Sequence, residues 1–217
     1  MGAHVGDSTL PIALAVGQAG AVIACEPNPF VFPTLERLAS LNRTKTQIIP
    51  LPIAATRIDG PVAMHYSDHG HCNGGIHEGI SPWVHGSAYE VIADGRHLPS
   101  YLTARFPTLL PRLRFIKIDA EGHDLAILES LESVIATHRP YLQGEFFPIK
   151  KSPSGYREQL FSFLDTRRYL IRRVEDRTPE FLAEEITLEN LSAGRSYDVF
   201  CVPRELGPAA GVAEAGR

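Results

Sequence analysis

Residues 113–124, LRFIKIDAEGHD, constrain the fold more than any other part of the chain. Residues 113–118 are mostly apolar on both alternating faces, which predicts an interior parallel strand covered by helices on each side. From His123 onward, apolar residues recur at helical spacing, at Leu125, Leu128, Leu131 and Ile135. A strand, an acidic turn and a helix in this order are typical of an α/β fold.

Two carboxylates occupy the turn between this strand and this helix. Asp119 and Glu121 flank a small alanine, and Gly122 permits a tight turn. Ligands of open α/β sheets bind beyond the carboxyl ends of the strands, so both side chains are candidate site residues. The alternative is that they only cap the helix and complement its dipole, which is worth about 0.5–2 kcal/mol. The stretch by itself leaves both interpretations open.

A second acidic strand end follows a glycine-bearing loop at the start of the chain. The loop contains Gly2 and Gly6, residues 10–19 are predicted to be helical, and strand 21–25 ends at Glu26. Gly6 and Glu26 are 20 residues apart, the separation at which a Rossmann-like unit places a carboxylate on ribose hydroxyls. The loop lacks the G-x-G-x-x-G pattern of dinucleotide sites. The pattern therefore suggests a ribose ligand without naming it, and a plain helix start before a polar strand end is the alternative.

The remaining periodicities predict alternating helices and strands with a β-rich end. Helices are expected over 30–42, 98–106 and 155–168, and strands over 47–55, 62–67, 89–93, 140–146, 169–174 and 196–202. Pro50 and Pro52 make 47–55 an edge or irregular strand. The glutamates between the last two strands are expected to be solvated: Glu180, Glu184, Glu185 and Glu189. This order predicts a doubly wound, mostly parallel sheet closed by an antiparallel pair.

Two further segments are expected to lie outside this framework. Residues 68–87 form a long loop with four histidines, Cys72 and Trp83, which we interpret as the wall of an acceptor site. Their spacings match no established ligand pattern, so no metal is expected. Residues 207–217 are rich in glycine and alanine and are predicted to be a disordered tail after a single domain spanning 1–206.

Bulk composition narrows the class of partner. The chain has 217 residues, of which 44% are hydrophobic and 21% charged, as in soluble globular proteins. Its net charge of -4 gives no basic footprint for nucleic acid or an anionic membrane, so a small-molecule partner is expected. Three widely separated cysteines suggest a reducing cytoplasm. The apolar stretch 10–25 is interrupted and shorter than the ~20 residues that span a bilayer.

The motifs taken together resemble the FkbM-type family of S-adenosylmethionine-dependent methyltransferases. They are Gly2-Ala3-x-x-Gly6, Glu26-Pro27-Asn28-Pro29, the KIDAEGHD stretch at 117–124, and a following strand that ends near Glu145. The K-I-D-x-E-G-x-[DE] signature is the specific part, whereas all class I methyltransferases share the first two. The resemblance implies a Rossmann-like, seven-stranded sheet with an antiparallel last strand, and S-adenosylmethionine laid over the carboxyl ends of its first strands.

The resemblance also implies roles for individual residues. Glycines let a backbone approach the amino-acid part of the cofactor, Glu26 would bind the ribose hydroxyls, and Ala54 would lie near the adenine. The implied cofactor-binding residues are Gly2, Ala3, Gly6, Glu26, Asn28, Ala54 and Asp119. The implied catalytic residues are Asp119 and Glu121 with Glu145 beside them, and His123 is a further candidate base. Lys117 is interpreted as an ion-pair partner of one of these carboxylates.

The sequence departs from the family pattern at two points. His4 stands where the family usually has asparagine. The apolar strand with a terminal aspartate that the family carries before the glycine loop is absent from the sequence. Such a strand lies mid-sheet, and without it the neighbouring strands would have unpaired backbone groups that cost about 1–3 kcal/mol each when buried.

The expected activity is O-methylation of a hydroxyl on a sugar or secondary metabolite, with Asp119 or Glu121 as the base. Two alternatives stay open. The spacing of Gly6 and Glu26 also fits an NAD-dependent Rossmann oxidoreductase, although the absent G-x-G pattern argues against it. The second alternative is a truncated, non-catalytic binding domain.

Overall fold

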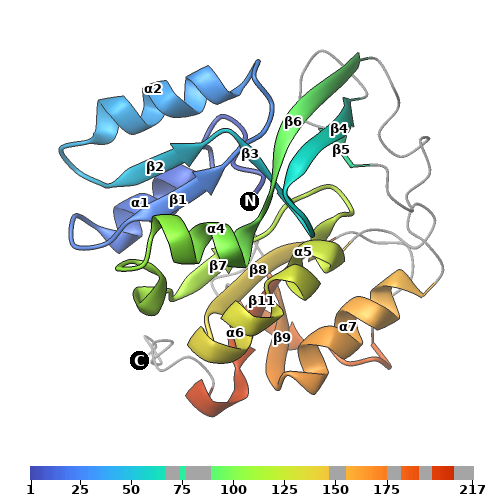
Figure 1. Cartoon of the computed structure of the whole chain (residues 1–217). Coiled ribbons are helices and arrows are strands. Elements are labelled where there is room, and N and C mark those ends of the chain that lie inside the picture. Colours follow the sequence, from blue (N-terminus) through green and yellow to red (C-terminus); the bar gives the residue numbers. More distant parts are fainter. Residues whose placement is uncertain (67–73, 77–88, 147–154, 175–181, 191–196, 208–217) are drawn as a thin grey trace.

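The computed structural model describes residues 1–66, 74–76, 89–146, 155–174, 182–190 and 197–207 (Figure 1). The described part is a mixed α/β structure, as the sequence predicted. Its strands form three hydrogen-bonded groups, of two, five and four strands. None of the described helices combines the length and hydropathy needed to cross a membrane. The predicted tail, 207–217, lies outside the described residues except for Gly207.

The two-stranded group is built from the N-terminal part of the chain. Strand β1 (Val22–Cys25) pairs in parallel with β2 (Ile48–Leu51). Helices α1 (Thr9–Val16) and α2 (Phe32–Asn42) contact these strands. Pro33 in the first turn of α2 suits the fixed backbone angle that a helix start requires. All four elements lie within the ranges predicted for them, except that α1 begins one residue earlier.

The prediction of one strand over 47–55 is wrong. Pro52 separates β2 from β3 (Ile53–Thr56), and the two strands pair with different neighbours. Proline has no N–H for a ladder, so the chain can change partners at this point. β3 pairs in parallel with β6 (Tyr89–His97), which also pairs antiparallel with β4 (Gly60–Tyr66). A two-residue strand, β5 (Gly74–Gly75), extends this four-stranded group at β4.

The five-stranded group has the order β10-β9-β11-β8-β7. β7 (Phe115–Lys117) and β8 (Tyr141–Phe146) are parallel, whereas β11 (Tyr197–Pro203) runs antiparallel to β8 and to β9 (Tyr169–Val174). The antiparallel last strand was predicted. β10 (Leu182–Glu185), which pairs with β9, was not, because its glutamates suggested a solvated segment. Charged residues are common in such edge strands, where they oppose pairing between molecules.

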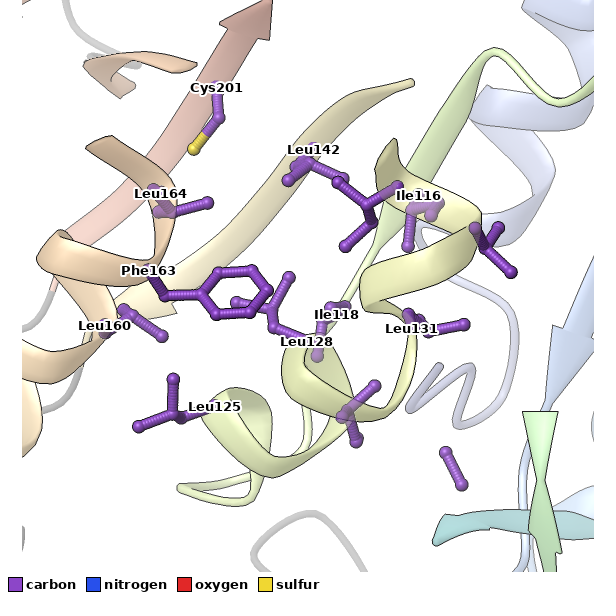
Figure 2. Close-up of a cluster of buried hydrophobic side chains, with 14 of the residues drawn as sticks. Ile116, Ile118, Leu125, Leu128, Leu131, Leu142, Leu160, Phe163, Leu164 and Cys201 are labelled. Carbon is purple, nitrogen blue, oxygen red and sulfur yellow. The ribbon is translucent and has the colours of Figure 1, made fainter. Parts of the chain in front are cut away.

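The single helix predicted after His123 is two helices, α5 (Asp124–Ser130) and α6 (Glu132–His138). At the break, the Ser130 hydroxyl donates a hydrogen bond to the carbonyl of Ile127, which competes with continued helical bonding. The apolar positions nonetheless face the core as predicted. Figure 2 shows Leu125, Leu128 and Leu131 with strand residues and with residues of α7 (Tyr156–Thr166). Burying each leucine contributes about 1.5–3 kcal/mol.

The remaining helical elements complete the cover of the strands. Helix α4 (Leu98–Arg105) follows β6, the 3-10 turn η1 (Leu110–Arg112) precedes β7, and η3 (Arg204–Leu206) follows β11.

The prediction of one continuous sheet is met only in part, since β1 and β7 are not hydrogen-bonded to each other within the described residues.

Candidate active site

A cavity of about 240 Å³ lies at the carboxyl ends of β1 and β7 and beside the first three residues of β3. Its lining comes from four parts of the chain: the N-terminal loop, the end of β1 with Glu26, the turn after β7, and the β3–β4 region with Gly75 and Ile76. Six of the predicted site residues line it, namely Gly2, Glu26, Ala54, Asp119, Glu121 and His123. The structure therefore brings together the acidic turn and the glycine loop that the sequence singled out separately.

Gly2 allows the N-terminal loop to pack directly on the acidic turn. Its backbone is left-handed, with φ at +68°, and a Cβ atom there would lie 1.8 Å from the carbonyl oxygen of Asp119. The loop is held on both sides. The Met1 amino group donates to the Lys117 carbonyl at 2.8 Å, and the Ala3 N–H donates to the Cys25 carbonyl at 3.0 Å. A glycine is thus required at position 2 by contact with protein backbone.

Glu26 presents a buried carboxylate whose orientation is fixed by backbone. Its Oε2 accepts the N–H of His4 and its Oε1 accepts the N–H of Asn28, both at 2.8 Å. Burial raises the pKa of Glu26 above its ordinary value, and these two hydrogen bonds oppose that rise. Each carboxylate oxygen has a second acceptor site. The arrangement can accept a pair of hydroxyl protons, one on each oxygen.

The departure at His4 does not remove this contact. His4 binds Glu26 through its backbone N–H, with φ at +47°. Asparagine and histidine are both enriched in this left-handed region among residues other than glycine. A histidine can therefore replace asparagine here because the contact depends on the backbone conformation.

Asn28 lies behind Glu26 and does not line the cavity. It is fully buried. Its Oδ1 accepts the N–H of Phe30 at 3.0 Å, and its Nδ2 donates to the Tyr89 hydroxyl at 3.2 Å. These bonds fix the turn that orients Glu26. The structure thus places Asn28 where it positions the carboxylate.

Lys117 and Asp119 form the ion pair that the sequence suggested. Lys117 Nζ lies 2.7 Å from Asp119 Oδ2, and the two side chains are 17% and 38% exposed. Both residues line the cavity. Because the lysine contacts Oδ2, the second oxygen, Oδ1, can face a ligand.

The turn itself is ordered by Asp124, which the sequence analysis did not assign to the site. Its carboxylate accepts the N–H of Ala120 and the N–H of Gly122, each at 3.0 Å. Glu121 between them has φ at +50°, a strained conformation for a residue other than glycine. The N-cap residue of α5 is His123, without a side-chain cap bond. The available sequence signals were a carboxylate in the first helical turn after a glycine and the last position of the K-I-D-x-E-G-x-[DE] signature, which Asp124 occupies.

An aromatic cluster on β4 and β6 was also missed. Tyr66 is buried and lines the cavity, and its ring stacks on that of Tyr89 at 4.9 Å between centroids. Phe30 meets Tyr89 edge-on at 5.8 Å. Burial and the negative charge of Glu26 raise the pKa of Tyr66 above its ordinary value. The sequence showed only alternating strands, and the pairing of Tyr66 with Tyr89 follows from the register of β4 against β6.

Besides Asn28, three predicted site residues do not line the cavity. Ala3 is buried against Ala24 and Leu35. A Cβ atom on Gly6 would lie 3.1 Å from Leu35 Cδ1, so packing against α2 explains this glycine. Glu145 lies in β8, in register with Asp198. The ligand-binding and catalytic assignments of these residues stay predictions.

Most of the loop predicted to form the acceptor wall, 68–87, lies outside the described residues. This applies to His69, His71, Cys72, His77, Trp83 and His85. Gly75 and Ile76 are described, and both line the cavity. Across the part of the chain that the structure describes, no three histidine, cysteine, aspartate or glutamate side chains form a group that could hold a metal ion.

Asparagine at position 124 is expected to change how stability depends on pH. Burial is the main cause that raises the pKa of Asp124 to about 6, so between about pH 4 and pH 6 the folded protein binds more protons than the unfolded chain. Asp124 therefore contributes stability below about pH 4 that is lost as the pH rises through 6. The unfolding free energy of the wild type minus that of Asp124→Asn should fall by about 3 kcal/mol between pH 4 and pH 7. Urea unfolding across this range measures it, with the exposed Asp165→Asn as control, and parallel profiles for wild type and Asp124→Asn would contradict the assignment.

Comparisons with known proteins agree with the resemblance seen in the sequence. The Methyltransferase FkbM domain matches residues 1–178. A search of curated proteins gave no match. Among solved structures, the chain is similar to a methyltransferase FkbM from Methylobacillus flagellatus KT, with a TM-score of 0.54 and 18% identity over 92% of this chain and 41% of that one. The chain thus spans about two fifths of that protein, and the likeness concerns the fold. On the match to its domain model, the chain belongs to the FkbM methyltransferase family.

Proposed function

We propose that the protein is an S-adenosylmethionine-dependent methyltransferase with a Rossmann-like, class I arrangement of its strands. The observation that carries this proposal is the convergence of Gly2, Glu26 and Asp119 on one cavity at the strand ends. These residues come from three separate motifs of the family, and they lie in the order that one cofactor needs. Parallel pairing of β1 with β2 and of β7 with β8 supports the class I arrangement.

The geometry supports a specific placement of the cofactor. Glu26 would accept the two ribose hydroxyls, one on each carboxylate oxygen. Ala54 and the stacked Tyr66 form an apolar side of the cavity suited to a flat adenine ring. The methionine end would then lie by Gly2 and Asp119, which are in direct contact.

Thermal shifts with S-adenosylhomocysteine and with NAD test the cofactor assignment. A ligand at about 100 times its Kd stabilises by about 2.7 kcal/mol, which corresponds to a Tm rise of about 5–10 °C for a chain of this size. We expect this rise with S-adenosylhomocysteine and none with NAD. Stabilisation by NAD alone would favour the oxidoreductase alternative. S-adenosylhomocysteine binding without any methyl transfer would favour the non-catalytic binding domain.

Glu26→Gln is expected to weaken S-adenosylhomocysteine binding by about 10- to 100-fold, because hydrogen bonds to a charged group are worth about 1.5–3 kcal/mol. Calorimetric titration measures the change in Kd. Glu36→Gln on the exposed face of α2 is the matched control and should bind like the wild type. Equal affinities of the Glu26 variant and the wild type would remove Glu26 from the ribose site.

The chemistry we propose is O-methylation of a sugar or secondary-metabolite hydroxyl. The sulfonium releases a neutral thioether, which is a good leaving group. The site must therefore hold the acceptor oxygen in line, about 3–3.5 Å from the methyl carbon, and exclude water. A nearby base then takes the hydroxyl proton. Asp119, Glu121 and His123 all line the cavity and are the candidates for this role.

A further inference from the structure

One buried amide links two separate parts of the fold beside the cavity. Asn28 follows β1 in the chain, whereas Tyr89 is the first residue of β6, and β1 and β6 belong to different hydrogen-bonded groups (Figure 1). The Asn28 side chain is fully buried, and its Nδ2 donates to the Tyr89 hydroxyl at 3.2 Å. Its Oδ1 accepts the N–H of Phe30 at 3.0 Å. The amide therefore joins the turn after β1 to the four-stranded group.

The backbone of the same residue holds the carboxylate proposed to bind ribose. The Asn28 N–H donates to Oε1 of Glu26 at 2.8 Å, so the place of this oxygen depends on where the Asn28 backbone lies. A buried amide that loses a partner is left with an unsatisfied donor, which is costly, and the residue shifts to find another partner. The Tyr89 hydroxyl thus acts on Glu26 through one residue.

The Tyr89 ring is fixed by two aromatic neighbours. It stacks on Tyr66, its register partner in β4, with 4.9 Å between centroids and 5° between the ring planes. Phe30 meets it edge-on at 5.8 Å. Burial raises the pKa of Tyr66, and a hydrogen bond with the Asn28 side chain opposes this rise. Two stacked rings from β4 and β6 thus place their hydroxyls at one amide.

Taking Glu26 as the ribose carboxylate of the proposed function, we propose that Tyr89 is a positioning residue for it. The Tyr89 hydroxyl holds the Asn28 amide, and the Asn28 N–H in turn orients Oε1 of Glu26. Tyr89 is not among the described residues that line the cavity, and it lies outside the motifs that carry the family resemblance. Recognition of the ribose hydroxyls therefore depends on the four-stranded group as well as on β1.

Tyr89→Phe tests this role because it removes one oxygen and keeps both ring contacts. The ligands are S-adenosylhomocysteine and its 2′,3′-dideoxy analogue, which lacks the two hydroxyls that Glu26 would accept. We expect Tyr89→Phe to weaken S-adenosylhomocysteine binding by about 3- to 10-fold, the loss that one ordinary hydrogen bond causes. Its Kd for the dideoxy analogue should stay within about twofold of the wild type, since a positioning role concerns only the hydroxyls. Calorimetric titration measures both.

Tyr141→Phe is the matched control, because Tyr141 is also a stacked tyrosine, 5.7 Å from Phe200, and belongs to β8. It should bind both ligands like the wild type. The double variant of Tyr89→Phe and Glu26→Gln should bind S-adenosylhomocysteine about as weakly as Glu26→Gln alone, because the hydroxyl acts through the carboxylate. Equal effects of Tyr89→Phe on the two ligands, or full additivity with Glu26→Gln, would overturn the proposal.

Hydrogen exchange of the Asn28 N–H gives a readout without any ligand. Tyr89→Phe should speed this exchange by about 3- to 10-fold, while the amides of β8 and β9 exchange as in the wild type. If the wild-type protein binds neither ligand, the proposed function fails, and this exchange alone decides whether Tyr89 positions Glu26. Faster exchange confined to the turn after β1 then supports the role, and unchanged exchange overturns it.

Discussion

Asp119→Asn is expected to lower the methyl-transfer rate by about 100- to 10,000-fold, the usual contribution of a general base. Asparagine keeps the shape of the side chain but cannot take the proton of an acceptor hydroxyl. Asp119 is the strongest candidate because it lines the cavity, contacts the glycine loop through its carbonyl, and has only Oδ2 in contact with Lys117. Transfer from labelled S-adenosylmethionine to a panel of hydroxylated sugars and secondary metabolites measures the effect.

The comparison with other carboxylates makes this test specific. A base acts on turnover, so Asp119→Asn should lower the methyl-transfer rate by far more than it weakens S-adenosylhomocysteine binding. Asp165→Asn, at an exposed side chain of α7, should keep full activity. Glu121→Gln tests the second carboxylate of the turn, and Glu145→Gln tests the one that does not line the cavity. Wild-type rates in both Asp119→Asn and Glu121→Gln would remove the turn from catalysis.

Gly2→Ala is expected to lower the Tm by about 4–20 °C and to abolish stabilisation by S-adenosylhomocysteine. Two effects add up at this position. A left-handed backbone costs an alanine about 1–2 kcal/mol, and overlap with the Asp119 carbonyl forces a backbone shift worth about 1–3 kcal/mol more. At about 2–4 °C per kcal/mol, the sum gives the expected change in Tm. Because the same shift separates the loop from the turn, the cavity loses its geometry.

Gly17→Ala separates these two effects. Gly17 has nearly the same φ as Gly2, +71° against +68°, but no atom lies within 4 Å of the position of its Cβ. With ψ at -170°, it should carry only the conformational part, about 1–3 kcal/mol, and should leave cofactor binding unchanged. Thermal unfolding with and without S-adenosylhomocysteine compares the two variants. Equal destabilisation by both would show that the loop does not pack tightly on the turn.

The strand, turn and helix unit was predictable because its signals are local. The apolar run before Asp119 and the helical spacing after His123 are properties of a few consecutive residues. The break at Leu131 was not predictable from spacing, because the apolar positions keep the same period through both helices. The split of 47–55 into two strands was signalled by its prolines, but their effect on pairing depends on which neighbours are present.

The part of the site that was predicted also rests on local signals. Gly2, Glu26 and Asp119 belong to recognisable motifs and do meet at one cavity. The role of Asp124 was not predicted because it depends on two N–H groups in the turn before it. The position of Tyr66 at the cavity was not predicted because it follows from pairing with a strand that begins at Tyr89.

The sequence by itself determined which residues stand at strand ends, which glycines precede a helix, and to which family the pattern is similar. These are features of short range, set by backbone conformation and by the period of apolar residues. The tertiary structure decided which strand ends converge on the cavity. The contact between Met1 and Lys117 joins residues 116 positions apart, and Gly2 is explained only by the carbonyl of Asp119. Such contacts depend on how separate layers pack, which no local pattern encodes.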